Sequence, residues 1–551
     1  MKIVKTDWSR WIDMAGVDPD ESMIQRCSVD HLQSALAGID GVTVAAAGVN
    51  RSGQYQPVPV PYEDTGDAPV PFPLLTDLPD FCEVLLHQET AGGHTAKIFV
   101  WVPLAWNQRL LAVGGGGTIT GPLWGEMKFT RSPTMSMALR NGFAATGTDA
   151  GIRGNSFFLW PFAEGGDFDE ELVRNWAHRS THDMATAARA VVEALTGIPP
   201  RYSYLMGCSG GGRQALASAQ HHPGDFDGVW AADGVLSWTR TMPAGIWPSL
   251  VMKELDNPVA VPKLEAFRAA FIKAFDGVGG LDDGIVGAFD AGVFDPYSLV
   301  GRATEAGVIT ERDAEVMERS WSGPRRKNGE RLYFGLRPDI VSWGMMGMFA
   351  TKEVDGALVP YAMPLSLAYF RWVTKDPSFD WQKLTFESFE ELFDRGVAEL
   401  GEIAADEADL SGLRDSGSKL LITQGVDDLI VFYQGAVDYY QRVIEAAGGE
   451  HEAASFARLF VTDGDIHGFC TGRGPGITLA DGMIALMNWV ENAEAPDAIV
   501  AERYDAESGA KLGSRPAFAY PMAPRYAGVG NPDESSSFVP YRVPGPEGLA
   551  R

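Results

Sequence analysis

Residues 202–222 read YSYLMGCSGGGRQALASAQHH, and this stretch decides the fold class of the chain. Its first residues are typical of a β-strand, and its last ten, RQALASAQHH, are typical of a helix. The turn between them, Gly207 to Gly211, fits the pattern G-x-S-x-G with Ser209 at its centre. Small flanking residues permit a strained turn that lifts the central side chain out of a sheet, and the helix N-terminus favours developing negative charge. The stretch predicts a nucleophile elbow at Ser209, with a purely structural turn as the alternative.

Short apolar segments alternate with helical patterns around this elbow. The strand-like segments are AKIFVWVPL (96–104), RLLAVGGGG (109–117), GFAATGTDAG (142–151), GVWAADG (228–234), KLLITQG (419–425) and ARLFVTDG (457–464). The helical segments outside the elbow include THDMATAARAVVEALTG (181–197), GAVDYYQRVIEAAGG (435–449) and ITLADGMIALMNWVEN (477–492). This alternation is typical of an α/β protein, in which helices cover a parallel sheet.

The alternation stops at about residue 234 and resumes at residue 419. The intervening residues are rich in aromatic residues and Met, so we expect a catalytic domain formed by 1–234 and 418–551, with a lid domain, 235–417, inserted into it. A second independent domain is the alternative for the inserted part. The last fifty or so residues are rich in Pro and Gly, which predicts an ordered coil on the core.

A serine hydroxyl needs a base and an acid to act as a nucleophile, and hydrolases with this elbow supply Asp and then His from later strand ends. The segment LLITQGVDDLIV ends a predicted strand and offers Asp428, with Asp427 as the rival. The following strand leads into DIHGFC, which makes His467 the expected base. His451 lies in a polar turn before that strand and is expected to be solvated.

Two backbone N–H groups are needed to bind the oxyanion of an acyl-transfer intermediate. Gly210, which follows the serine, is the first expected donor. The glycine run after the strand at 109–113 offers Gly117, or else Gly116, as the second. A glycine run is also found in phosphate-binding loops, but this one lacks the Lys-Ser/Thr ending of a P-loop.

Cys208 directly precedes the elbow serine, and Cys470 lies three residues after His467. A disulfide between them would tie the serine loop to the histidine loop and would contribute on the order of 5 kcal/mol at most from loop entropy. It would also hold the nucleophile and the base in register. Two reduced, buried thiols are the alternative.

Composition narrows the classes of partner. The 551 residues carry a formal net charge of −28, and no run of Lys or Arg is present, which disfavours nucleic acid and anionic membranes as partners. No apolar stretch reaches the roughly 20 residues that span a bilayer, and the first residues lack the apolar core of a secretory signal. A small-molecule substrate is expected, while the compartment and the oligomeric state stay open.

Several segments beyond the elbow resemble the tannase/feruloyl esterase family over nearly the whole chain. They are GCSGGGRQALASAQHHPGDFDGV, HRSTHDM, GERLYFGL, DPSFDWQKLTFE, ADLSGLRDSGSKLLI, VDYYQRV and NWVENAEAPDAIVAERY. The resemblance implies an α/β-hydrolase fold with a large lid inserted between the serine and aspartate segments. It also implies Ser209, Asp428 and His467 as the triad, because the spacing from Gly425 to Tyr439 matches the family without a gap.

Further site residues rest on the resemblance alone. It implies that the cysteines beside Ser209 and His467 are bonded, and that Cys27 and Cys82 form a second disulfide. It also implies a structural calcium ion in the lid. Its expected ligands lie in FDGVGGLDDGIV and are the Asp276 and Asp283 carboxylates and the Leu281 and Ile285 carbonyls. Such hard oxygen donors suit Ca²⁺.

This chain departs from the family pattern at three places. Two residues, Gly468 and Phe469, separate His467 from Cys470, where the cysteine usually follows the histidine directly. Gly279 stands where the calcium loop usually has Asp, with Asp282 as a possible substitute. The strand end before the acid is QGV instead of HGW, which alters the wall of the pocket.

Together these features predict a serine carboxylic ester hydrolase with no organic cofactor. The resemblance implies an ester of an aromatic acid, of the feruloyl, galloyl or terephthaloyl type. The lid residues Trp343, Phe349, Phe370 and Trp372 are candidates for the wall that grips the ring, although apolar cap residues more often form the core of the cap. The alternatives are an esterase for a non-phenolic ester and a silent binding protein on the same fold. A thiol redox protein would need a C-x-x-C-type pair, which the chain lacks.

Overall fold

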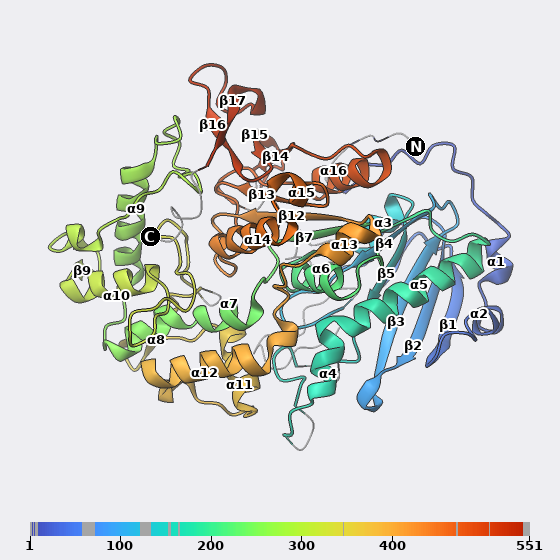
Figure 1. Cartoon of the computed structure of the whole chain (residues 1–551), viewed down its shortest axis with the longest axis horizontal. Helices are drawn as coiled ribbons and strands as arrows, with labels where there is room; N and C mark the ends of the chain where they lie inside the picture. The colour runs from blue at the N-terminus through green and yellow to red at the C-terminus, as the bar shows by residue number, and fades with distance from the viewer. Residues whose placement is uncertain are drawn as a thin grey trace.

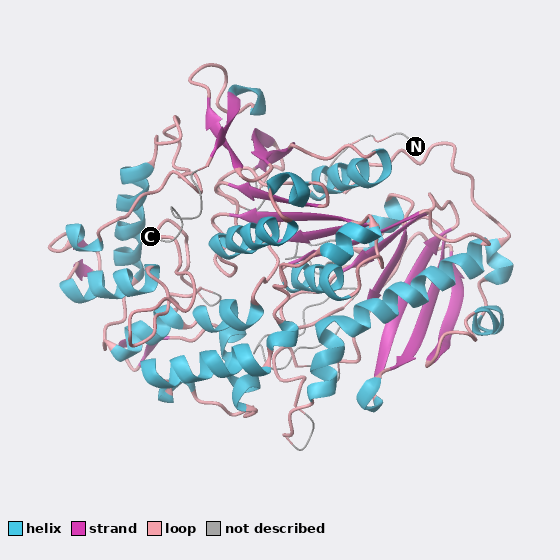
Figure 2. Cartoon of the chain, viewed as in Figure 1, coloured by secondary structure: helices cyan, strands magenta, loops and turns pink. Residues whose placement is uncertain are grey.

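The computed structural model describes residues 3, 5, 9–57, 72–121, 134–152, 156–162, 166–344, 347–469, 472–505 and 507–543. A nine-stranded sheet runs through the molecule, with helices on both of its faces (Figure 1, Figure 2). The strand order is β1-β2-β3-β5-β4-β6-β7-β12-β13. The bounds are β1 Val42–Asn50, β2 Phe81–Glu89, β3 Thr95–Pro103, β4 Arg109–Val113, β5 Ala144–Thr148, β6 Tyr202–Cys208, β7 Gly228–Ala232, β12 Lys419–Gly425 and β13 Ala457–Thr462.

The strands from β5 to β13 pair in parallel, whereas β1, β2 and β3 pair antiparallel at one edge of the sheet. In the order of the sheet, the strands from β3 to β13 are those that the sequence predicts. The edge strands β1 and β2 are absent from that prediction. β1 reads VTVAAAGVN, and its run of Ala and Gly gives a weak strand pattern.

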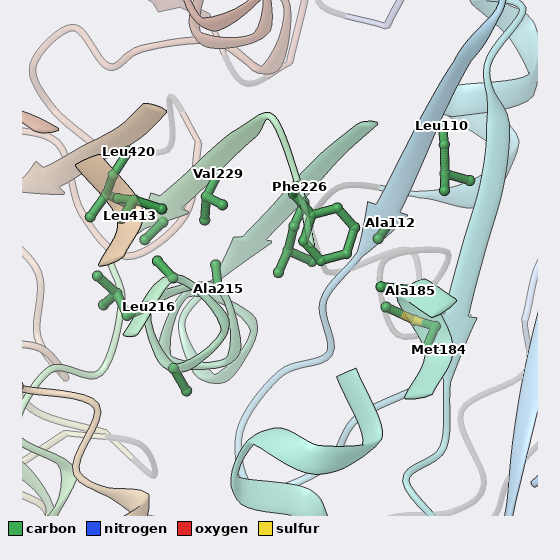
Figure 3. Close-up of a cluster of buried hydrophobic side chains, with 14 of the residues drawn as sticks. Leu110, Ala112, Met184, Ala185, Ala215, Leu216, Phe226, Val229, Leu413 and Leu420 are labelled. Atoms are coloured by element: carbon green, nitrogen blue, oxygen red, sulfur yellow. The ribbon is translucent and has the colours of Figure 1, made fainter. Parts of the chain in front are cut away.

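Alternation along the central strands places successive side chains in two different cores. In β4, Leu110 and Ala112 pack into a core with the helices α5, α6 and α14, part of which is drawn in Figure 3. Leu111 and Val113 of the same strand face the opposite core, with α3 and α16. These helices are α3 Met135–Arg140, α5 Ser180–Thr196, α6 Gly210–His221, α14 Tyr433–Ala447 and α16 Leu479–Asn492. Because both faces of the sheet are covered, β4 and β7 consist almost entirely of buried residues.

The described residues between β7 and β12 add no strand to the nine-stranded sheet. They form a helical body at one end of the molecule, where α7 to α12 gather in Figure 1. The bounds are α7 Trp238–Ala244, α8 Trp247–Glu254, α9 Val261–Phe275, α10 Glu311–Trp321, α11 Pro364–Thr374, α12 Phe386–Glu399 and α13 Ser411–Ser416, with the short ladders β8 Ala303–Thr304 to β9 Gly307–Val308 and β10 Thr351–Val354 to β11 Ala357–Pro360. We call this segment the insertion. Its apolar core also takes in Ile119, Phe157 and Phe158 from loops of the sheet domain.

The C-terminal segment differs from its prediction as an ordered coil. It forms two antiparallel ladders, β14 Ala498–Tyr504 with β15 Lys511–Phe518, and β16 Met522–Tyr526 with β17 Phe538–Arg542. In the second ladder, Pro524 of β16 pairs with Pro540 of β17, and both strands continue past these prolines. Within the described part of the chain, no helix combines the length and apolarity needed to cross a membrane.

Candidate active site

Ser209 lies at the tip of a sharp turn between β6 and α6. Its backbone adopts φ 60° and ψ −122°, a strained conformation for a residue with a side chain. The turn closes so tightly that a Cβ on Gly207 would lie 2.2 Å from the backbone oxygen of Gly211. Ser209 itself is only half-buried. The predicted strand–turn–helix therefore forms, and its geometry keeps the hydroxyl at the edge of the sheet.

Asp428 and His467 meet at the carboxyl ends of β12 and β13. Nδ1 of His467 lies 2.7 Å from Oδ2 of Asp428. The other carboxylate oxygen of Asp428 accepts the N–H groups of Ile430 at 2.8 Å and Val431 at 2.9 Å. The Asp428 side chain is fully buried, while that of His467 is 18% exposed. The acid is thus fixed by backbone donors, and the ring that it holds remains accessible.

The rival aspartate, Asp427, belongs to a different interaction. Its Oδ2 accepts a hydrogen bond from Nε of Arg473 at 2.6 Å. Arg473 also donates to Asp339 of the insertion at 2.8 Å, so this pair connects the loop after His467 with the insertion. His451, the rival histidine, lies in α15 (Glu450–Ala454) with a side chain that is 96% exposed. Neither rival joins the pair of Asp428 and His467.

A third carboxylate, Asp233, was missed by the sequence analysis. It follows β7 directly and is buried, and its two oxygens accept the N–H groups of Gly425 at 2.8 Å and Gly468 at 2.9 Å. One oxygen lies within 4.8 Å of ligand atoms of both Asp428 and His467. The only signal for Asp233 in the sequence is its position directly after a predicted strand. That strand lies between the strand before the serine and the strand before the acid. Asp233 therefore bridges the loops that carry Asp428 and His467.

The same turn also connects this pair to the serine. The Ser209 N–H donates to the carbonyl of Ala232 at 3.0 Å, and the Val235 N–H donates to the carbonyl of Ser209 at 3.2 Å. Because Asp233 lies between those two residues, one short segment contacts both the elbow and the histidine loop. Ser209, Asp428 and His467 are thereby brought to one edge of the sheet.

The charges of this site shift the proton affinities of its groups. Burial lowers the pKa of His467, but the adjoining Asp428 carboxylate and the charge of Asp233 raise it more, so that it lies at about 9. Burial and the neighbouring Asp428 charge raise the pKa of Asp233 well above its usual value, against the opposing effect of His467 and the two amides. Burial therefore acts on both groups, and the presence of two carboxylates beside one imidazole adds to the pKa of each.

The two expected oxyanion donors lie against each other. A Cβ on Gly210 would lie 2.2 Å from the carbonyl oxygen and 2.9 Å from the nitrogen of Gly117. Gly210 is the first residue of α6, so its N–H has no acceptor within the helix. The N–H of Gly116 already donates to Ile119 at 3.1 Å. The structure therefore favours Gly117 over Gly116 as the neighbour of Gly210.

Three of the four predicted wall residues pack inside the insertion. Phe349, Phe370 and Trp372 are at most 3% exposed. Phe370 stacks on Phe379, and the Trp372 indole donates to the carbonyl of Phe158 at 2.9 Å. The burial of these three rings favours the alternative, in which apolar cap residues form the core of the cap. Trp343 is half-buried and keeps accessible surface.

Neither of the two predicted disulfides is seen among the described residues. Cys208 is buried at the end of β6, and burial raises the pKa of its thiol. Its predicted partner, Cys470, lies outside the described residues. Cys27 and Cys82 are not joined by a disulfide in the structure, but both are buried and their thiols are hydrogen-bonded to each other. They are therefore neighbours, as the resemblance implies, in the form of two thiols.

The predicted calcium loop connects α9 to the C-terminal ladders. The Asp276 carboxylate accepts the N–H groups of Asp283 at 3.2 Å and Gly284 at 2.9 Å, and the Asp283 carboxylate pairs with Arg515 of β15. Leu281, Asp283 and Ile285 line a small cavity together with Asp290 and Asp463. A Cβ on Gly279 would lie 2.8 Å from a carboxylate oxygen of Asp290. Asp290 therefore fills the space beside the glycine that replaces the usual aspartate.

This fold and this site are those of an α/β-hydrolase: a serine elbow is followed, in chain order, by a buried aspartate and a histidine that are hydrogen-bonded to each other. The model of the family described as "Tannase and feruloyl esterase" matches residues 82–540, and the chain belongs to this family. The predicted α/β-hydrolase fold and the prediction of a carboxylic ester hydrolase are thereby confirmed.

Individual relatives agree with this assignment. The chain is 33% identical over 486 residues to a probable feruloyl esterase of Arthroderma benhamiae, covering 85% of this chain and 88% of the relative. It is 27% identical over 524 residues to the mono(2-hydroxyethyl) terephthalate hydrolase of Piscinibacter sakaiensis, covering 84% and 85%. The solved structure of tannin acyl hydrolase from Aspergillus niger matches its fold with a TM-score of 0.79 at 18% identity, covering 97% of both chains.

Proposed function

We propose that this chain hydrolyses esters of aromatic acids, with Ser209 as the nucleophile, His467 as the base and Asp428 as the partner of the base. The hydrogen bond of 2.7 Å between His467 and Asp428, beside the strained serine turn, carries the proposal. It fixes Nδ1 as the ring nitrogen that the acid holds, which makes Nε2 the nitrogen that transfers the proton.

In the first half of the reaction, Oγ of Ser209 attacks the ester carbonyl carbon while Nε2 of His467 takes the hydroxyl proton. The carbonyl π electrons move to the oxygen, which becomes an oxyanion. When the tetrahedral intermediate collapses, the bond to the alkoxy group breaks, and His467 gives its proton to the leaving alcohol. Asp428 stabilises the imidazolium that exists between these two transfers.

The N–H groups of Gly117 and Gly210 are the donors for the oxyanion. Their backbones touch, and the amide of Gly210 has no intrahelical acceptor. In the second half of the reaction, His467 takes a proton from water, the hydroxide attacks the acyl carbon, and Ser209 Oγ leaves with the proton returned by His467. No organic cofactor takes part in either half.

The substrate class rests on the family. The relatives named above are called a feruloyl esterase, a terephthalate monoester hydrolase and a tannin acyl hydrolase, and each name specifies an aromatic acyl group. We propose that the insertion acts as the lid over such a group. It packs on loops next to the elbow, because its core includes Ile119 and Phe157, and Phe157 lies directly on Gly117. Of the four predicted wall residues, Trp343 retains the surface that a ring contact needs.

The experiment is acid release from methyl ferulate, methyl gallate, mono(2-hydroxyethyl) terephthalate and a short aliphatic ester, with the wild type and S209A in parallel. We expect turnover of at least one aromatic ester and its loss in S209A. Turnover of the aliphatic ester alone would favour the non-phenolic alternative. A failure of all four, with a folded protein, would favour the binding-protein alternative.

We also propose that the loop 276–285 binds calcium. The ligands would be the carboxylates of Asp276 and Asp283 and the carbonyls of Leu281 and Ile285, with Asp290 in place of the aspartate that Gly279 replaces. Three carboxylates line the cavity here, those of Asp283, Asp290 and Asp463, and hard oxygen donors suit Ca²⁺. Arg515 pairs with Asp283, so the ion and the guanidinium compete for one carboxylate.

We propose finally that Cys27 bonds to Cys82 and Cys208 to Cys470 under oxidising conditions. The hydrogen bond between the thiols of Cys27 and Cys82 supports the first bond, since it shows that the two side chains are neighbours. Thiol titration of the denatured, unreduced protein should find no free cysteine. Two free thiols per chain would remove one of the two bonds, and peptide mapping would identify which.

A further inference from the structure

Four histidines and one aspartate gather where α5 and α6 lie side by side, away from the catalytic residues. We call His178, His182, His221, His222 and Asp225 the histidine cluster. His221 is the last residue of α6, whose first turn follows Ser209. A helix of 12 residues is about 18 Å long, so the cluster lies at the opposite end of the helix from the nucleophile. The reaction proposed above does not use it.

Local structure aims these side chains at one another. His178 lies in a π-helical turn, η4 (Asn175–Arg179), which continues directly into α5. His182 follows one turn later on the same helix face. The buried Arg213 fixes the π turn, because it donates to the carbonyls of Ala177 at 3.0 Å and Trp176 at 3.2 Å. Such interruptions of a helix are frequent at functional sites.

The cluster is closely spaced. Nδ1 of His182 lies 2.9 Å from Oδ2 of Asp225, and Nδ1 of His178 lies 3.0 Å from Nε2 of His222. The rings of His182 and His222 stack with centroids 4.4 Å apart. Most decisively, one ligand atom each of His182, His222 and Asp225 lies within 4.8 Å of the other two. Ligands of a tetrahedral zinc ion are about 3.3 Å apart, so small side-chain rotations would complete the site.

The cluster is open to solvent, since the His182 side chain is 44% exposed. An ion could therefore reach it from solution.

We propose that His182, His222 and Asp225 form a binding site for a divalent transition metal of the zinc class. Two imidazoles and one carboxylate are a ligand set that zinc accepts, with water in the fourth position. His178 supports His222 through the 3.0 Å contact, and its other nitrogen lies 3.5 Å from Glu402 of the insertion, which is the kind of outer partner that orients metal-binding histidines. A bound ion would hold the end of α6 to α5.

The experiment is equilibrium dialysis of chelator-treated protein against ZnCl₂, with zinc counted per chain by elemental analysis. We compare the wild type with H182A/H222A, with the exposed-histidine control H451A, and with H467A. The last variant is needed because Asp233, Asp428 and His467 are the other described group with ligand atoms this close. We expect H182A/H222A to bind one zinc fewer than the wild type, and H451A and H467A to keep that zinc.

A second readout does not depend on a folded double variant. Co²⁺ bound by the wild type should give the visible absorption of a four-coordinate ion with nitrogen ligands, and D225N should weaken it. Zinc at about 100 times its dissociation constant should raise the melting temperature of the wild type by about 2 °C. An unchanged zinc count in H182A/H222A, or no zinc and no cobalt spectrum in the wild type, would overturn the site. Hydrolysis by Ser209 should continue in either case.

Discussion

Nδ1 of His467 lies 2.7 Å from Oδ2 of Asp428, 39 residues earlier in the chain. The two meet because β12 and β13 are adjacent parallel strands, paired up to Gly425 and Thr462, so the loops that leave them begin side by side. Asp427, one residue earlier, instead pairs with Arg473. Two neighbouring carboxylates thus have separate partners, and substitutions can separate their roles.

We expect D428N to lower kcat by about 10⁴-fold, because an amide neither stabilises the imidazolium nor holds the required tautomer. D427N is the matched control. It should keep most of kcat, but should lower the free energy of unfolding by about 2 kcal/mol, since it weakens a charged hydrogen bond to Arg473. Steady-state kinetics and denaturant melts on both variants check this. Loss of kcat in D427N with a functional D428N would reverse the assignment of the acid.

The pH dependence of hydrolysis follows from the raised pKa of His467. The base must be neutral to accept the serine proton, and its pKa of about 9 keeps it protonated over most of the neutral range. The rate therefore rises with pH, and we expect kcat/KM to increase tenfold per pH unit below a midpoint near pH 9. A stopped assay across pH 6 to 10 measures the profile. A plateau already reached at pH 7 would contradict the shift.

Asp233 should act on that profile as a positioning residue. Its charge raises the pKa of His467, so D233N should move the midpoint of kcat/KM to lower pH. The amide of Asn keeps an oxygen for only one of the two N–H groups, from Gly425 and Gly468, so a loss of kcat accompanies the shift. If Asp233 had a purely structural role, D233N would lower kcat and leave the midpoint in place. D233E would then not restore kcat.

The contrast between Asp428 and Asp233 shows what the sequence could supply. The elbow and the base follow a fixed chain order with strand signals before each, so the pattern alone predicts Ser209 and His467. The same pattern left Asp427 as a rival, and the choice of Asp428 rested on the family resemblance. Asp233 has no such pattern, because its role depends on β7 lying between β6 and β12 in the sheet. Most of the predicted lid residues could not be placed from the sequence, for a related reason. The sequence of α11 shows that Phe370 and Trp372 are apolar. It does not show whether such a ring faces a substrate or another core residue, as Trp372 faces Trp238.

The glycine at 117 can be tested directly. G117A would place a Cβ 2.1 Å from the ring of Phe157, on a backbone with φ 60° that side chains rarely adopt. We expect the loop to shift and the oxyanion to lose a donor, which lowers kcat by about 10² to 10³-fold with little change in KM. G121A is the control, since a Cβ there meets no atom of the described residues within 4 Å. Full activity in G117A would remove this amide from the mechanism.

Calcium should stabilise the wild type, although Arg515 already pairs with one of the expected ligands. After EGTA treatment, we expect added Ca²⁺ to raise the melting temperature by about 2 °C at 100 times its dissociation constant. D290N should abolish the rise, because Asp290 fills the space beside Gly279. R515Q should increase calcium affinity, since it frees the Asp283 carboxylate. The zinc-site variant H182A/H222A should respond to calcium as the wild type does. A melt that stays unchanged after verified metal removal and calcium addition would contradict calcium binding by this loop.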